Sequence, residues 1–116
     1  MGLYFYNGTN KMVRFVYAEF DPNCRGDVKW KKRGWWSISP GETVKVSSVW
    51  AGGHKFLYYA EDGFGHIWAG NYFTQIPAYA FDWCWNMGST DSRTLGLKMT
   101  DEISSTSQDY KITINV

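Results

Sequence analysis

Residues 12–20, MVRFVYAEF, decide the fold class, because apolar and polar side chains alternate along them. Successive residues of an extended chain point to opposite faces, so Val13, Phe15 and Tyr17 share one face. A charged residue, Arg14, falls on the other face. This alternation predicts a half-buried β-strand.

Similar short segments recur along the chain and are separated by turn residues. The last of them is residues 109–116, where Tyr110 and Ile112 share a face. Asn-Gly is the strongest short-range hairpin signal, so Asn7-Gly8 predicts a hairpin between the first two strands. The spacing of strands and turns predicts seven or eight strands in one antiparallel β-sandwich domain that spans residues 1–116.

The composition indicates a core built from aromatic rings. Trp, Tyr and Phe together supply 19% of the 116 residues, and such side chains fit the pleated surface of a sheet. Each ring buries roughly 150–250 Å², so a few of them fill a small core between two sheets. One segment departs from the strand pattern. Residues 78–85 permit one short helical turn, because Ala78, Ala80 and Phe81 tolerate a helix and Gly88 would end it.

The charge balance excludes one large class of partner. Lys+Arg 12 and Asp+Glu 11 leave a net charge of +1, so the basic field that binds nucleic acid is missing. The one basic run, residues 29–33, is expected to be a solvated strand edge. No stretch approaches the roughly 18–20 apolar residues that span a bilayer. A monomer and a homodimer are both compatible with the sequence.

The compartment stays open on sequence alone. The first residues lack the apolar region of a secretion signal, which leaves a cytoplasmic protein and a secreted mature segment as alternatives. Cys24 and Cys84 allow two interpretations. One disulfide would close a loop of about sixty residues and stabilise the fold by roughly 4 kcal/mol in a chain-entropy model. The missing signal favours two free thiols instead.

Residues 34–42, GWWSISPGE, carry two adjacent tryptophans followed by a Pro-Gly turn. With residues 58–62, YYAED, and the later Trp68, Phe81 and Cys84, this segment resembles a bacterial family known as domain of unknown function 1036. The resemblance covers most of the chain, although the further cysteines that the family often carries are missing here. It implies a small β domain and no particular activity, since the family's function is not established.

Exposed aromatic rings are the expected contact surface, with burial in the core as the alternative for each ring. Trp35 and Trp36 are neighbours in a predicted strand, so one of them is expected to face outward. Trp50 and Tyr72 lie near glycine-rich turns and are expected to form a platform for a ligand. Asp62 is the expected polar partner, because short polar side chains hydrogen-bond sugar hydroxyls while sugar CH groups pack on rings.

Catalytic and metal-binding patterns are missing from the sequence: no metal-site spacing, nucleophile signature or opposed carboxylate pair is visible. The chain is therefore predicted to be a non-catalytic binding module without metal or cofactor. A glycan or another cell-envelope ligand is the first hypothesis. A protein-protein adaptor is an alternative, because interface hot spots use the same aromatic residues. A membrane-active, toxin-like β protein is another, because aromatic rings favour the lipid interface.

Overall fold

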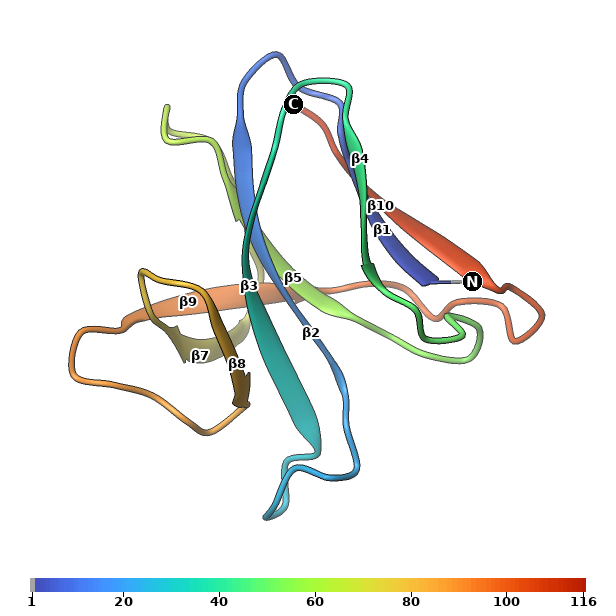
Figure 1. Cartoon of the computed structure of the whole chain (residues 1–116), viewed down its shortest axis with the longest axis vertical. Helices are drawn as coiled ribbons and strands as arrows, with labels where there is room; N and C mark the ends of the chain where they lie inside the picture. Colours follow the sequence, from blue (N-terminus) through green and yellow to red (C-terminus); the bar gives the residue numbers. More distant parts are fainter. Residues whose placement is uncertain (1) are drawn as a thin grey trace.

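A computed structural model describes residues 2–116, which form ten β-strands and no helix (Figure 1). The strands are β1 (Gly2–Asn7), β2 (Val13–Phe20), β3 (Trp30–Ile38), β4 (Thr43–Ser47), β5 (Leu57–Glu61), β6 (Ile67–Trp68), β7 (Tyr72–Ile76), β8 (Phe81–Cys84), β9 (Arg93–Met99) and β10 (Asp109–Ile114). The predicted all-β fold is confirmed, with ten strands in place of seven or eight. The excess comes from short strands such as β6, which has two residues. The described residues thus include no helix able to cross a membrane.

The strands form two sheets that pack as a sandwich. One sheet has the order β10-β1-β4, and the other has the order β7-β9-β5-β2-β3-β8 with β6 beside β5. β1 and β10 pair in parallel, with Phe5 opposite Ile112, whereas the other pairings of the described strands are antiparallel. The predicted antiparallel sandwich therefore needs one correction. Its first and last strands lie side by side in the same direction (Figure 1).

The first core lies between the two sheets and is built from aromatic rings. The Phe5 ring of β1 stacks on Phe15 of β2, with their centroids 3.8 Å apart. Phe15 stacks in turn on Trp36 of β3 at 5.7 Å, and Phe5 meets Tyr58 of β5 edge-on at 6.0 Å. A row of four rings thus runs from the β3 side of the sandwich to the β5 side. The predicted inward face of β2 supplies part of this core.

A second core lies on the opposite face of the large sheet, which curls until β3 approaches β7. Val16 and Ala18 of β2 are fully buried there, so the prediction of a half-buried strand is wrong. The curl is held by Lys32 of β3, whose amine donates to the Thr74 hydroxyl at 2.8 Å and to the Gln75 carbonyl at 2.7 Å. Lys32 has no exposed surface, so the prediction of a solvated basic edge is wrong at this residue.

The Asn7-Gly8 pair does not form the predicted hairpin. β1 and β2 belong to different sheets, and the chain crosses between the sheets at this point. The buried Asn7 amide donates to the carbonyls of Lys11 at 2.7 Å and Ile38 at 2.9 Å. Its oxygen accepts from the Thr9 backbone N–H at 2.9 Å. These bonds satisfy backbone groups at the crossing, a structural role that the dipeptide signal does not reveal.

The segment compatible with a helical turn is instead strand β8, and it is covalently tied to the rest of the chain. Its first residue, Phe81, lies opposite Gly34 of β3. Cys24 and Cys84 form a disulfide with Cα atoms 5.7 Å apart. The helical turn and the free thiols are therefore both wrong. The edge of β3 offers backbone hydrogen-bond partners to β8, which outweighs the weak tolerance of these residues for a helix.

Two glycines explain much of the residue pattern in segment 34–42. Gly34 sits where a Cβ atom would overlap the Val16 side chain, so the close packing of β3 on β2 excludes any larger residue. Gly41 has a φ of +78°, which side chains rarely adopt. The Glu42 carboxylate completes this turn by accepting from the Ser39 backbone N–H at 2.9 Å. The segment is thus specified by packing and by turn geometry.

Candidate binding cleft

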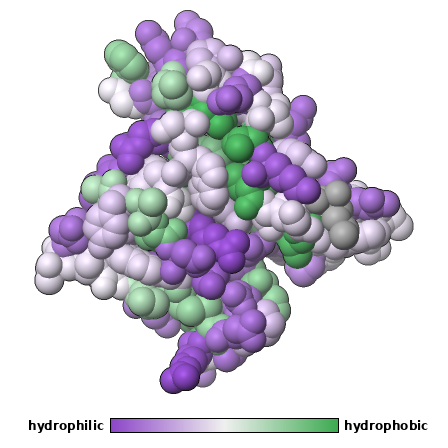
Figure 2. Space-filling view, viewed as in Figure 1, coloured by the Kyte–Doolittle hydropathy of each residue, from purple (hydrophilic) through white to green (hydrophobic). Residues whose placement is uncertain are grey.

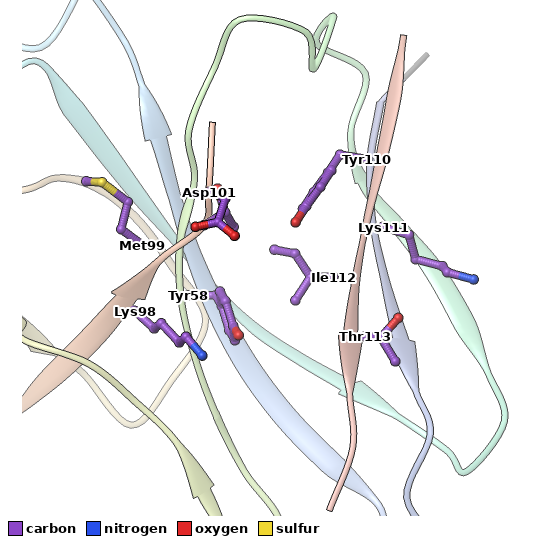
Figure 3. Close-up of a pocket in the computed structure, with 9 residues that line it drawn as sticks. Tyr58, Lys98, Met99, Asp101, Tyr110, Lys111, Ile112 and Thr113 are labelled. Atoms are coloured by element: carbon purple, nitrogen blue, oxygen red, sulfur yellow. The ribbon is translucent and has the colours of Figure 1, made fainter. Parts of the chain in front are cut away.

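A cleft with a volume of about 330 Å³ opens between the sheets on the side where β10 faces β5 and β9 (Figure 3). β5 supplies Tyr58, β9 supplies Lys98, and β10 supplies Tyr110 and Ile112. Asp101, which follows β9, also lines the cleft. These strands come from the middle and the end of the chain, so the cleft exists only once both sheets have paired.

The register of the strands directs these side chains at one space. Tyr58 lies opposite Lys98 in the β5–β9 pairing, so both side chains leave the same face of the large sheet. Tyr110 and Ile112 are alternate residues of β10 and share a face. Ile112 is buried and Tyr110 is half-buried. The rings of Tyr58 and Tyr110 therefore border the cleft from opposite sheets, with Ile112 between them (Figure 3).

Hydrogen-bonding groups surround the two rings. A tyrosine hydroxyl is ordinarily protonated at neutral pH, and burial together with the nearby Tyr110 raises the pKa of Tyr58 further. The Lys98 amine and the Asp101 carboxylate border the same space. Lys111 points away from the cleft, with its amine 5.2 Å from the centre of an aromatic ring on the outer face of the small sheet. The cleft thus offers apolar rings together with donors and an acceptor.

Trp35, a predicted site residue, packs against the second core rather than the cleft. Its indole N–H donates to the Pro77 carbonyl at 2.8 Å. The Arg14 guanidinium lies over the ring at 4.5 Å from its centroid, and the Arg93 guanidinium lies at 5.7 Å. The half-buried ring is therefore held on several sides by the protein itself.

Trp36 lies at the opposite mouth of the sandwich from the cleft, between β3 and β4. Its half-buried ring stacks on Phe15. Val44 and Val46 of β4 are also half-buried and pack against the same core. Figure 2 shows hydrophobic side chains at the surface in this gap between β3 and β4. Of the predicted site residues, Trp36 is the one that belongs to a partly open apolar strip.

The other three predicted residues lie apart from the cleft. Trp50 is 42% exposed and donates its indole N–H to a loop carbonyl at 3.4 Å. Tyr72 is 46% exposed at the start of β7. The buried Asp62 carboxylate accepts from the backbone N–H groups of Phe64 at 2.7 Å and His66 at 3.1 Å, so it shapes a turn. The structure does not bring the five predicted residues into one site.

The residues that line the cleft were missed by sequence reasoning because the cleft is non-local. The alternation along residues 109–116 places Tyr110 and Ile112 on one face, and this was the signal available for Tyr110. No local pattern places Tyr58 across from it. That juxtaposition depends on the parallel pairing of β1 with β10, which brings the end of the chain beside its beginning.

Comparison with protein-family models, with curated proteins and with solved structures gave no match to this chain. Within residues 2–116, no group of three or more His, Cys, Asp and Glu side chains is placed to hold a metal ion. The functional argument therefore rests on the geometry and chemistry of the chain itself.

Proposed function

We propose that this chain is a non-catalytic binding module that recognises a saccharide of the cell envelope in the cleft between β5, β9 and β10. The observation that carries the proposal is the pair of rings, Tyr58 and Tyr110, that border one cleft beside polar side chains. Sugar rings present CH groups that pack on aromatic faces and hydroxyls that need both donors and acceptors. The cleft supplies each of these partners.

The polar groups of the cleft suit a ligand rich in hydroxyls. Lys98 donates hydrogen bonds, Asp101 accepts them, and the protonated Tyr58 hydroxyl does both. The volume of about 330 Å³ lies near the lower end of the range of roughly 300–1,000 Å³ for small-molecule sites. These properties favour a short saccharide over a large folded partner at this position.

The disulfide supports a ligand outside the reducing cytosol. Cys24, in the connection between β2 and β3, is joined to Cys84 of β8. Such bonds persist in oxidising compartments and are rare in the cytosol, where thiols are kept reduced. An envelope glycan is therefore the form of saccharide that best fits both the cleft and the covalent structure.

Isothermal titration calorimetry with a panel of short glycans tests the proposal. The protein is expected to bind one class of glycan saturably. Tyr110→Ala removes one ring of the cleft and is expected to weaken that binding about tenfold, because ring contacts contribute on the order of 1 kcal/mol or more. Tyr72→Ala removes an exposed tyrosine outside the cleft and is expected to leave the affinity unchanged. Equal losses in both variants, or no binding of any glycan, would contradict the proposal.

A protein partner is the second candidate, favoured by the apolar strip of Trp36, Val44 and Val46 at the opposite mouth. Tryptophan is enriched among the residues that dominate protein interfaces. If this strip is the functional surface, Trp36→Ala is expected to abolish partner capture while Tyr110→Ala has no effect. The two variants therefore separate the two candidates.

A further inference from the structure

The turn between β5 and β6 presents exposed apolar side chains on a well-bonded backbone. The Asp62 carboxylate accepts from two backbone N–H groups of this turn and lies 2.9 Å from the His66 Nδ1 atom. The Asp62 backbone N–H donates to the His66 carbonyl at 3.2 Å. Phe64 is nevertheless 72% exposed and Ile67 is 61% exposed. Because the turn is closed by these bonds, it holds both side chains toward solvent.

A third exposed apolar residue lies immediately before β2. Arg14 lies opposite Glu61, the last residue of β5, so Met12, two residues before Arg14, lies near the turn that follows β5. Met12 is 51% exposed. The three side chains, named here the apolar tip, are Met12, Phe64 and Ile67. The β5–β6 connection, which carries Phe64, projects from the molecule (Figure 1).

Basic side chains surround the apolar tip. The Lys11 amine lies 4.6 Å from the centre of the Phe64 ring. Arg14 and Arg93 stand beside the tip with side chains 43% and 51% exposed. Both contact the same carboxylate, Glu61, at 3.9 Å and 3.1 Å. Two carboxylates, those of Glu61 and of Asp62 in the turn, thus lie among three cationic side chains, which leaves one net positive charge around the apolar side chains.

We propose that the apolar tip docks this protein on a lipid bilayer that contains anionic headgroups. The apolar side chains enter the boundary between headgroups and acyl chains, and the surrounding cations meet the lipid phosphates. The charge around the tip is complementary to such a surface. The tip shares no residue with the cleft lined by β5, β9 and β10.

The shape of the tip favours a membrane over a protein partner. Its apolar side chains project from a turn and from the start of a strand, and a soft interface accepts such projections without a matching groove. Peripheral binding of this kind adds burial of a few apolar side chains to electrostatic attraction, and neither contribution suffices alone. Binding is therefore expected to need anionic lipid and to weaken at high salt.

Co-sedimentation with vesicles tests the inference, using phosphatidylcholine alone and phosphatidylcholine mixed with phosphatidylglycerol. The protein is expected to bind the anionic vesicles and not the neutral ones. Phe64→Ser is expected to lower partitioning about tenfold, because the ring no longer leaves water. Lys11→Gln is expected to lower it about fivefold. Phe73→Ser removes a residue of β7 that is 64% exposed away from the tip, and it is expected to bind as the unsubstituted protein does.

Three outcomes would overturn the inference: no binding to anionic vesicles, equal binding to neutral vesicles, or equal losses in the Phe64→Ser and Phe73→Ser variants. Thermal unfolding of each variant serves as the folding control, and unchanged midpoints are expected because both phenylalanines are mostly exposed. Capture of the tip by an acidic protein with no vesicle binding would also count against a membrane.

Discussion

The two cores of this small domain are closed in different ways. Between the sheets, stacked rings such as Phe5 and Phe15 fill the space. Hydrogen bonds between the layers, such as the one from the Tyr17 hydroxyl to the Val46 carbonyl at 3.1 Å, supplement this apolar packing. Within residues 2–116, no further sheet packs on the outer face of the large sheet. There the sheet curls over its own face, held by hydrogen bonds from the buried Lys32 amine and by the Cys24–Cys84 disulfide. Directed bonds and a covalent bond thus take the place of a facing sheet.

Truncating the ring row is expected to give the largest loss of stability. Phe15 contacts both Phe5 and Trp36 and is fully buried. Phe15→Ala is expected to lower the free energy of unfolding by about 3–5 kcal/mol, because it removes apolar contacts and leaves a cavity. Urea denaturation followed by tryptophan fluorescence measures this loss. A loss below about 1 kcal/mol would show that the first core does not depend on the row.

Breaking the disulfide tests the second core in the same way. Replacing Cys24 and Cys84 by Ser is expected to lower the free energy of unfolding by about 2–4 kcal/mol, since the unfolded chain regains freedom across a separation of 60 residues. Reductant added to the unsubstituted protein is expected to give a similar loss. An unchanged denaturation midpoint in both experiments would remove the disulfide from this account of the second core.

The pH dependence of stability also distinguishes the cores. Burial lowers the pKa of Lys32 to about 8 from its ordinary value of 10.5. Between these values the unfolded chain binds more protons than the folded one, so the free energy of unfolding is expected to rise with pH. Lys32→Met is expected to abolish the rise. Denaturation midpoints test both the rise and its loss in the variant. They are measured from pH 7 to pH 10, a range of about three units that includes the Lys32 pKa.

The buried tyrosines give the opposite slope at higher pH. Burial raises the pKa of Tyr17 to about 12, with the Glu19 carboxylate adding to the shift, and burial likewise raises that of Tyr59 to about 12. Above their ordinary pKa of 10.0, the unfolded chain releases protons that the folded chain keeps, so stability is expected to fall. This fall is expected to persist in the Lys32→Met variant. If the Lys32→Met variant lost the fall in stability at high pH as well as the rise, the two slopes would not have separate origins.

The fold class was readable from the sequence because it depends on local alternation. The inward set of β2 that includes Phe15 and Tyr17 follows from period-two patterning, as does the shared face of Tyr110 and Ile112 on β10. The curl of the large sheet was not readable. A lysine in a basic run is ordinarily solvated. The oxygen atoms that make burial of Lys32 tolerable come from β7 and from the Met87 carbonyl, which follows β8.

The site was less predictable than the fold. Aromatic content correctly indicated a ring-filled core, but composition cannot say which rings border an open space. Trp35 was a candidate because it adjoins Trp36, and the structure covers it with Arg14 and Pro77. Tyr58 lines the cleft because a parallel pairing brings β10 to its side, and no signal within a short window encodes that pairing.

The most direct test of the central claim is a map of backbone amide chemical shifts of the ¹⁵N-labelled protein during titration with the glycan that binds best. The account predicts that the largest changes in chemical shift occur in the cleft, at Tyr58, Lys98 and Tyr110. The amide signals of Trp36 and Val44, at the opposite mouth, are expected to stay unchanged. Shifts concentrated at Trp36 and Val44 would contradict it and would make the β3–β4 strip the binding surface.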